Sequence, residues 1–274
     1  MYKYDPYDAV MDRLAALAVQ AVGSPEAAVQ AYWLGVLCAA LDAMPGKRLT
    51  LDRLRRRAGD GAPLPDWAQA YAGTSLKRLI ESEIWLDNED FVSLPLPQVM
   101  TDGAWRAPGE MGMRLCPAAH LYAADIREEM RRLWQAARWL YGVHPATWQG
   151  APGEVLSGAV LFEAGLFFAC HEYFETLWGR TGDPASDFYQ GLIQVAVAMR
   201  HLESHNRRGA RILLQSGAGR LRRYPVVYKG LALGPFLAQL EQVQQNLSEA
   251  SEEWVWSGAP RLLSDAEWSD TDAF

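Results

Sequence analysis

Histidine and carboxylate side chains occur at helical spacing near residue 171. His171 and Glu175 are four positions apart, so on a helix they share a face, and Glu172 lies one position around from His171. An imidazole beside two carboxylates could ligate a divalent cation or transfer protons. Buried polar groups without partners are costly, so we expect these side chains to meet one another or a ligand.

A second polar stripe follows in the next stretch of helical sequence. Gln190 and Gln194 are four residues apart, and His201 comes seven residues later, which places all three on one helical face. Consecutive helices joined by a short loop usually pack antiparallel. We therefore expect this stripe to face the stripe that contains His171, and Trp178 to form a wall of the resulting pocket.

The composition of this predicted pocket suits metal chemistry. His171, Glu175 and His201 could ligate Zn, Mn or Fe and leave one position open for water. Glu172 could then be the catalytic general base on that water, as in a metal-dependent hydrolase. The other side chains expected to line the ligand pocket are Gln190, Gln194, Trp178 and Asn206.

Two other interpretations of the same residues stay open. In one, His171 and Glu175 orient each other within a buried hydrogen-bond network that has only a structural role. In the other, the site carries out acid–base chemistry or binds a small molecule without a metal. Asn206 also has a structural interpretation, which we favour: it caps a helix, and the arginines that follow it need not bind an anion.

Apolar periodicity and capping signals predict that helices carry these residues. The fold expected is mainly α, with an N-terminal helical module that is winged-helix-like and has one small β-hairpin, followed by a C-terminal α-helical bundle. The predicted helices cover residues 25–44, 50–58, 74–82, 118–141, 161–178, 187–204, 209–216 and 234–247, and the hairpin covers residues 84–94 with D-N-E-D as its turn.

Four segments follow from these elements. Residues 1–112 form the N-terminal module, 113–150 a connecting helix and linker, 151–247 the helical bundle, and 248–274 an acidic tail. The tail contains three tryptophans and is expected to be either a mobile tail or a docking peptide. The bundle could also serve as the contact between copies of the chain.

Charge argues against DNA as the partner of the N-terminal module. The candidate recognition helix has Lys77 and Arg78 but also Glu81, and the candidate wing carries three acids. Neutralisation of phosphates supplies most non-specific affinity for DNA, which an acidic wing would oppose. A structural or protein-binding role is favoured, although arginines at 53 and 55–57 leave DNA binding open.

The length, charge and cysteine content limit the classes of protein to which the chain could belong. The chain has 274 residues and a net charge of −7, and its apolar run over 155–170 is interrupted by Glu163 and too short for a membrane span. Three cysteines that are far apart form no disulfide framework. We expect a cytoplasmic protein with no membrane partner.

Several motifs together resemble the domain of unknown function 309 family, over roughly residues 155–235. They are F-E-A-G from Phe162, H-E-Y-F-E-T-L-W from His171, Q-G-L-I-Q-V-A-V-A-M-R-H from Gln190 and N-R-R-G-A from Asn206. The resemblance implies a compact all-helical domain in which His171, Glu175 and Trp178 form an element suggested to bind metal. It implies no established activity.

The chain departs from the family pattern at three positions. Glu163 stands where Asn is common, Ala169 where Glu is common, and His205 where Gly is frequent. Glu163 could therefore add a carboxylate to the edge of the predicted pocket.

Overall fold

The computed structural model describes the chain as a helical protein with two compact units. The residues described are 6–42, 53–54, 56, 64–81, 86–87, 114–115, 117–143, 153–180, 185–249 and 258–263. One unit contains the described residues up to Gln135, and the other contains those from Ala136 on. The division falls inside the segment predicted to connect module and bundle, within helix α7 (Ala123–Arg138).

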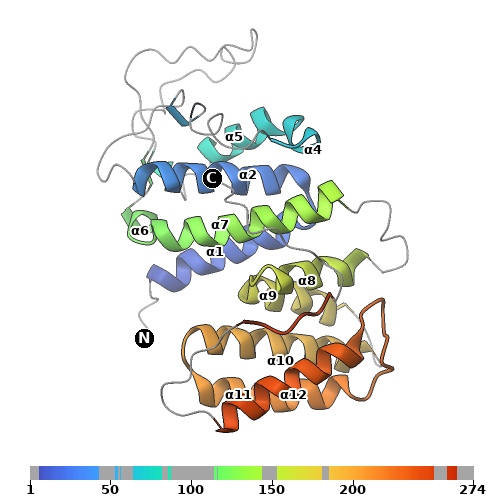
Figure 1. Cartoon of the computed structure of the whole chain (residues 1–274). Coiled ribbons are helices and arrows are strands. Elements are labelled where there is room, and N and C mark those ends of the chain that lie inside the picture. The colour runs from blue at the N-terminus through green and yellow to red at the C-terminus, as the bar shows by residue number, and fades with distance from the viewer. Residues whose placement is uncertain are drawn as a thin grey trace. The chain divides into compact units, whose positions relative to one another are not determined.

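Helix α2 (Pro25–Asp42) is the centre of the N-terminal unit. It is buried almost all round, and it packs against α1 (Pro6–Ala21), α4 (Asp66–Gln69) and α5 (Ala72–Glu81). The helix begins as predicted, because Ser24 Oγ accepts a hydrogen bond from Ala27 N at 3.4 Å. Figure 1 shows α2 beside α5. Helix α1 was not predicted.

Polar contacts fix α5 against α2. Trp33 Nε1 donates to the carbonyl of Ala72 at 3.1 Å, and the buried Ser75 hydroxyl donates to the carbonyl of Glu26 at 2.8 Å. On the surface, Arg78 pairs with Glu26 at 3.0 Å. Arg78, a cation of the candidate recognition helix, is therefore already engaged by a carboxylate of α2.

The predicted β-hairpin differs from the strand pairing in the structure. Strand β1 (Leu86–Asp87) pairs antiparallel with β2 (Arg114–Leu115), so Leu86 lies opposite Leu115. β1 thus takes its partner from a later segment, beyond the predicted D-N-E-D turn. The rest of the hairpin, and most of the helix predicted over 50–58, lie outside the described residues.

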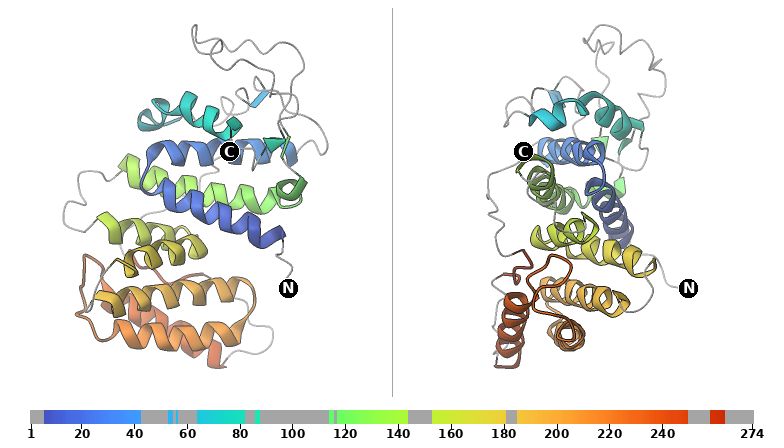
Figure 2. Two further views of the ribbon diagram at one scale, coloured as in Figure 1. Left: turned by 180° about the vertical axis from the view of Figure 1, so that it is seen from behind. Right: turned by 90° about the vertical axis from the view of Figure 1, so that its right-hand side faces the viewer.

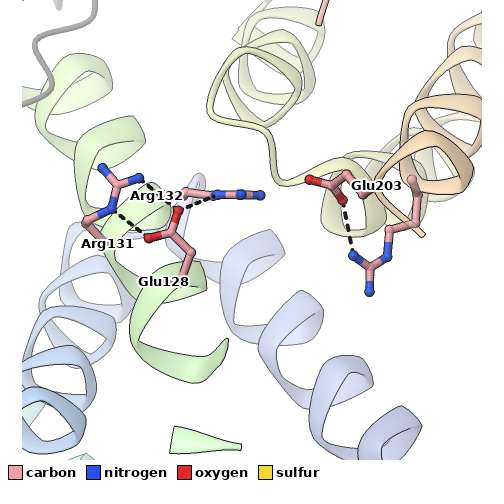
Figure 3. A network of polar contacts seen from close by, with 5 residues as sticks. Glu128, Arg131, Arg132 and Glu203 are labelled. Atoms are coloured by element: carbon pink, nitrogen blue, oxygen red, sulfur yellow. Dashed lines mark hydrogen bonds and ion pairs between the residues drawn. The ribbon is translucent and has the colours of Figure 1, made fainter. Parts of the chain in front are cut away.

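Helix α7 follows the short α6 (Pro117–His120) and continues into a π-helical turn, η2 (Trp139–Val143). Its apolar face buries Ile126, Leu133 and Trp134. On its polar side the Glu128 carboxylate lies between two guanidinium groups, as Figure 3 shows, at 2.8 Å from Arg131 Nε and 2.9 Å from Arg132 Nε. Hydrogen bonding by Arg131 lowers the pKa of Glu128 despite partial burial.

The second unit is a bundle of consecutive helices. They are α8 (Gly153–Glu163), α9 (Phe167–Trp178), α10 (Ala185–Glu203), α11 (Arg207–Leu221) and α12 (Leu233–Glu249). α9 packs on α8 and α10, and α11 packs on α10 and α12 (Figure 1). Phe162, Phe174, Phe188 and Phe236 are fully enclosed in its core. Among the described residues, no helix combines the length and the apolar composition needed to cross a bilayer.

The prediction of a single helix over 161–178 is wrong, because the chain turns between α8 and α9. Gly165 has φ 74°, Gly165 N donates to the Phe162 carbonyl, and Leu166 N donates to the Leu161 carbonyl. These two bonds and the left-handed glycine form a Schellman motif, which ends α8. Helix α8 begins at Gly153, eight residues before the start of the helix predicted over 161–178.

Candidate functional site: a histidine–carboxylate group on helix α9

Helix α9 separates an apolar face from a polar one. Phe167, Cys170 and Phe174 are buried in the bundle, whereas His171, Glu172 and Glu175 lie toward its surface. Cys170 is deeply buried, which raises the pKa of its thiol, and its Sγ donates to the Gly158 carbonyl at 3.4 Å. The cysteine is therefore structural, and the chemistry of this helix belongs to its polar face.

The imidazole of His171 lies between two carboxylates. Its Nε2 is 3.0 Å from Glu175 Oε1, and its Nδ1 is 3.3 Å from Glu172 Oε1. The Nε2 contact has hydrogen-bond geometry. The Nδ1 atom is buried and has no hydrogen-bond partner within the described part of the chain, so its approach to Glu172 is electrostatic only. One imidazole nitrogen thus lacks the partner that burial demands.

The burial of the three side chains is unequal. The His171 side chain is 19% exposed, whereas the carboxylates of Glu172 and Glu175 are 45% and 47% exposed. The ring of Phe168 lies 5.9 Å from the imidazole, centroid to centroid. A ligand arriving from solvent would therefore meet the carboxylates first and the imidazole behind them.

The described residues contain one group of at least three side chains with ligand atoms close enough to hold a metal ion. It consists of His171, Glu172 and Glu175, whose ligand atoms all lie within 4.8 Å of one another. Its members come from a single turn of α9. His201, which the sequence placed in the same metal site, is not in this group.

His201 instead belongs to the turn that joins α10 to α11. Its Nδ1 lies 3.2 Å from Nδ2 of Asn206, and Asn206 Oδ1 accepts from Gly209 N at 3.0 Å. A Cβ on Gly209 would come within 3.0 Å of the His201 ring. The capping role favoured for Asn206 is confirmed, and His201 is packed into this cap.

Both glutamines of the predicted pocket lie on α10, and Gln194 lies beside α11. A Cβ on Gly217 of α11 would lie 3.2 Å from Gln194 Cβ and 2.9 Å from the Gly191 carbonyl oxygen. Gln194 Oε1 is buried, with no hydrogen-bond partner among the described residues. Gln190 is half-buried on the same helix. The structure thus places Gln194 at the α10–α11 seam.

Trp178 ends α9 and is 39% exposed. Its indole Nε1 donates to Ser186 Oγ at 2.6 Å, which ties the end of α9 to the start of α10. The indole N–H of Trp178 thus has its hydrogen-bond partner within the bundle.

Between residues 200 and 230, four arginines form ion pairs within the C-terminal unit. Asp187 at the start of α10 binds Arg220 and, at 2.6 Å, Arg223. Arg222 pairs with Glu241 of α12 at 2.7 Å. Arg200 pairs at 3.1 Å with Glu203, which is labelled in Figure 3. These contacts serve the packing of α10, α11 and α12.

Glu163 has a function that the sequence interpretation missed. Its side chain is only 1% exposed, and it binds residues 261–263 of the tail instead of contributing to the histidine group. Burial raises the pKa of this carboxyl, although hydrogen bonds from Leu263 and Leu262 and the charge of Arg261 oppose the rise. The signal in the sequence was the carboxylate itself, within an otherwise apolar helix.

Comparison with curated proteins and with solved structures gives no match. Residues 155–213 match a family model described as a domain of unknown function, DUF309. The matched range begins in α8 and ends in α11, so it includes all of α9 and its histidine–carboxylate group. The match confirms that the C-terminal region of this chain is similar to the DUF309 family.

Proposed function

We propose that the C-terminal unit binds a divalent metal ion at His171 and Glu175, with Glu172 beside them. The observation that carries the proposal is the grouping of one imidazole and two carboxylates within 4.8 Å on one helical turn. Imidazole and carboxylate ligands suit Zn, Mn or Fe. A set from one helix leaves the remaining coordination positions for water or a substrate.

The distances support this proposal, and they also suit the competing interpretation, in which the residues form a purely structural pair. Ligand atoms about 2.1 Å from one zinc ion are roughly 3 to 3.5 Å apart, and the Nε2–Oε1 distance here is 3.0 Å. The same distance suits a hydrogen bond in a purely structural pair. Nδ1 of His171 is buried and makes no hydrogen bond within the described part of the chain, and its contact with Glu172 Oε1 at 3.3 Å is electrostatic only. A finished structural network would satisfy this atom, which supports a ligand-binding site.

Glu172 is the candidate base in this proposal. It approaches His171 from the Nδ1 side, opposite Glu175, and is nearly half exposed. A carboxylate beside a metal-bound water could accept its proton, which is the chemistry of a metal-dependent hydrolase. Without a metal, the same three groups could bind a small molecule or carry out acid–base chemistry. His201 is left out of the ligand set, because it is not among the described side chains whose ligand atoms come together here.

The test is elemental analysis of the untagged full chain after equilibration with Zn, Mn or Fe and removal of free metal. We expect near-stoichiometric metal in wild type and its loss in His171→Ala and Glu175→Gln. His201→Ala is the matched control and should keep the metal. Wild type that cannot be loaded contradicts metal binding, and loss of metal in His201→Ala would restore His201 to the site.

A regulatory or scaffold role is the second candidate, with the N-terminal unit as a winged-helix-like module. The Arg78–Glu26 pair favours a protein partner over DNA, because it neutralises a cation of the candidate recognition helix. In this interpretation the bundle is a structural or dimerisation core. Tight, salt-sensitive binding of the full chain to a DNA duplex would contradict the preference for protein.

A further inference from the structure

Residues 258–263 lie against the bundle, between α8 and α12. This short segment is the red trace in Figures 1 and 2. Arg261 N donates to Gln239 Oε1 of α12 at 2.8 Å, and Arg261 Nε donates to Glu163 Oε2 of α8 at 2.8 Å. The amides of Leu262 and Leu263 both donate to Glu163 Oε1, the latter at 2.6 Å. Three consecutive backbone amides are therefore bound by two side chains.

Burial makes this contact selective. The Glu163 carboxylate is 1% exposed, so its charge depends on these donors in place of water. Leu262 and Leu263 are 1% and 4% exposed, and Pro260 is also buried. The site therefore selects a segment that has an arginine, two backbone amides after it that can donate hydrogen bonds, and two aliphatic side chains.

The tail matches this site by charge as well as by shape. Residues 241–274 contain eight acidic residues and a single basic residue, Arg261. That one cation lies on the buried carboxylate of the site. An otherwise acidic tail therefore presents its one arginine where the bundle presents Glu163.

The way the segment is held resembles the binding of a linear peptide motif. The segment forms no helix or strand, and its backbone is held by side chains of two helices. Such motifs combine backbone hydrogen bonds for affinity with side-chain pockets for specificity. All the contacts given above are available to a peptide of the same sequence that is not covalently attached.

We propose that Glu163, Gln239 and the apolar surface beside them form a recognition site for an arginine–leucine–leucine segment. The chain's own residues 260–263 fill the site in cis, and a partner polypeptide carrying the same three residues displaces them. A tethered segment acts at an effective concentration near millimolar. A partner segment of equal affinity must therefore reach a comparable concentration before it displaces the cis segment.

The first test empties the site in the full chain with the substitutions Arg261→Ser, Leu262→Ser and Leu263→Ser. A fluorescent peptide with the sequence of residues 257–265, S-G-A-P-R-L-L-S-D, is titrated by anisotropy. We expect saturable binding to the emptied variant and binding at least about tenfold weaker to wild type, whose site is occupied. A peptide with serine in place of both leucines should not bind.

Glu163→Gln in the emptied background tests the carboxylate itself. The amide keeps an oxygen acceptor but loses the charge that pairs with arginine, so affinity should fall at least about tenfold. Glu154→Gln is the matched control, because Glu154 is an exposed acid of the same helix that pairs with Arg180. Equal binding by the Glu163→Gln variant would overturn the assignment of the site.

A second measurement uses wild-type protein and does not depend on the emptied variant folding. Hydrogen exchange in residues 258–263 should accelerate when millimolar peptide is added, because the displaced segment regains contact with water. Unchanged exchange, or a folded emptied variant that ignores the peptide, would overturn the proposal and make the segment a permanent part of the bundle.

Discussion

His205 shows how a single backbone conformation can cost stability. The residue has φ 58°, and it ends α10 in the same Schellman pattern that ends α8. His205 N donates to the Leu202 carbonyl, and Asn206 N donates to the His201 carbonyl. The left-handed conformation costs a residue with a Cβ roughly 1 kcal/mol, and glycine avoids that cost. A histidine at this position is therefore a local departure from the best choice.

We predict that His205→Gly raises the free energy of unfolding by about 0.5 to 1 kcal/mol, because it removes the left-handed strain. Denaturant unfolding followed by circular dichroism measures the change. His205→Ala is the control and should give no such gain, since alanine keeps the Cβ. A destabilised glycine variant would show that the histidine side chain contributes more than its backbone costs.

The residues of the candidate site differ in how far sequence could locate them. His171 and Glu175 lie within one helical turn, so helical spacing alone predicts their contact. Whether His201 contacts these residues depends on how α10 is rotated about its own axis, and residue spacing does not determine that rotation. The close approach of the two backbones at Gly191 and Gly217 goes with a rotation that places Gln194 toward α11.

At the scale of elements, α10 and α11 are joined by close backbone approach. Gly191 and Gly217 lie where the two helices meet, and a Cβ on Gly217 would be 2.9 Å from both the Gly191 carbonyl oxygen and Val195 Cγ2. A backbone oxygen in a packed helix cannot move aside cheaply. The seam therefore requires residues without side chains.

We predict that Gly217→Ala destabilises the bundle by about 1 to 3 kcal/mol, because the helices must separate or shift to admit the methyl group. Gly219→Ala is a matched control two residues along the same helix, where no atom lies within 4 Å of the added Cβ. It should be neutral or stabilising by up to about 1 kcal/mol. Thermal melting of both variants provides the comparison, and equal melting temperatures would contradict the tight seam.

The helices themselves were largely predictable, and their ends were less so. The apolar pattern over 187–204 corresponds to α10 (Ala185–Glu203), and that over 234–247 to α12 (Leu233–Glu249). The pattern over 161–178 hid a turn, because Leu161 and Phe162 before Gly165 and Leu166 and Phe167 after it are all apolar and buried. The pairing of β1 with β2 depends on a distant segment, which local turn residues cannot indicate.

At the scale of the whole molecule, Glu163 couples the bundle to pH. Its folded-state pKa is raised by burial above the ordinary value of 4.5. The folded state therefore holds this proton more tightly than the unfolded state. Between 4.5 and the raised pKa, the contribution of this group to stability falls as pH increases.

We predict that the stability of wild type relative to Glu163→Gln decreases as pH rises through that window and then levels off. Glutamine does not titrate, so the difference between the two proteins isolates the carboxyl group. Urea unfolding from pH 4 to pH 8 measures it. A difference that grows with rising pH would mean that the arginine and the amides outweigh burial.

The bond between Leu263 N and Glu163 spans 100 residues of the chain. A ribosome adds about 5 to 20 residues per second, so roughly 5 to 20 s separate the synthesis of the two partners. During that interval α8, α9 and α10 can fold around a carboxylate that has none of its three tail donors. Docking of the tail is then a late event in the synthesis and folding of each molecule. A nascent chain stalled before residue 261 would expose an empty peptide site.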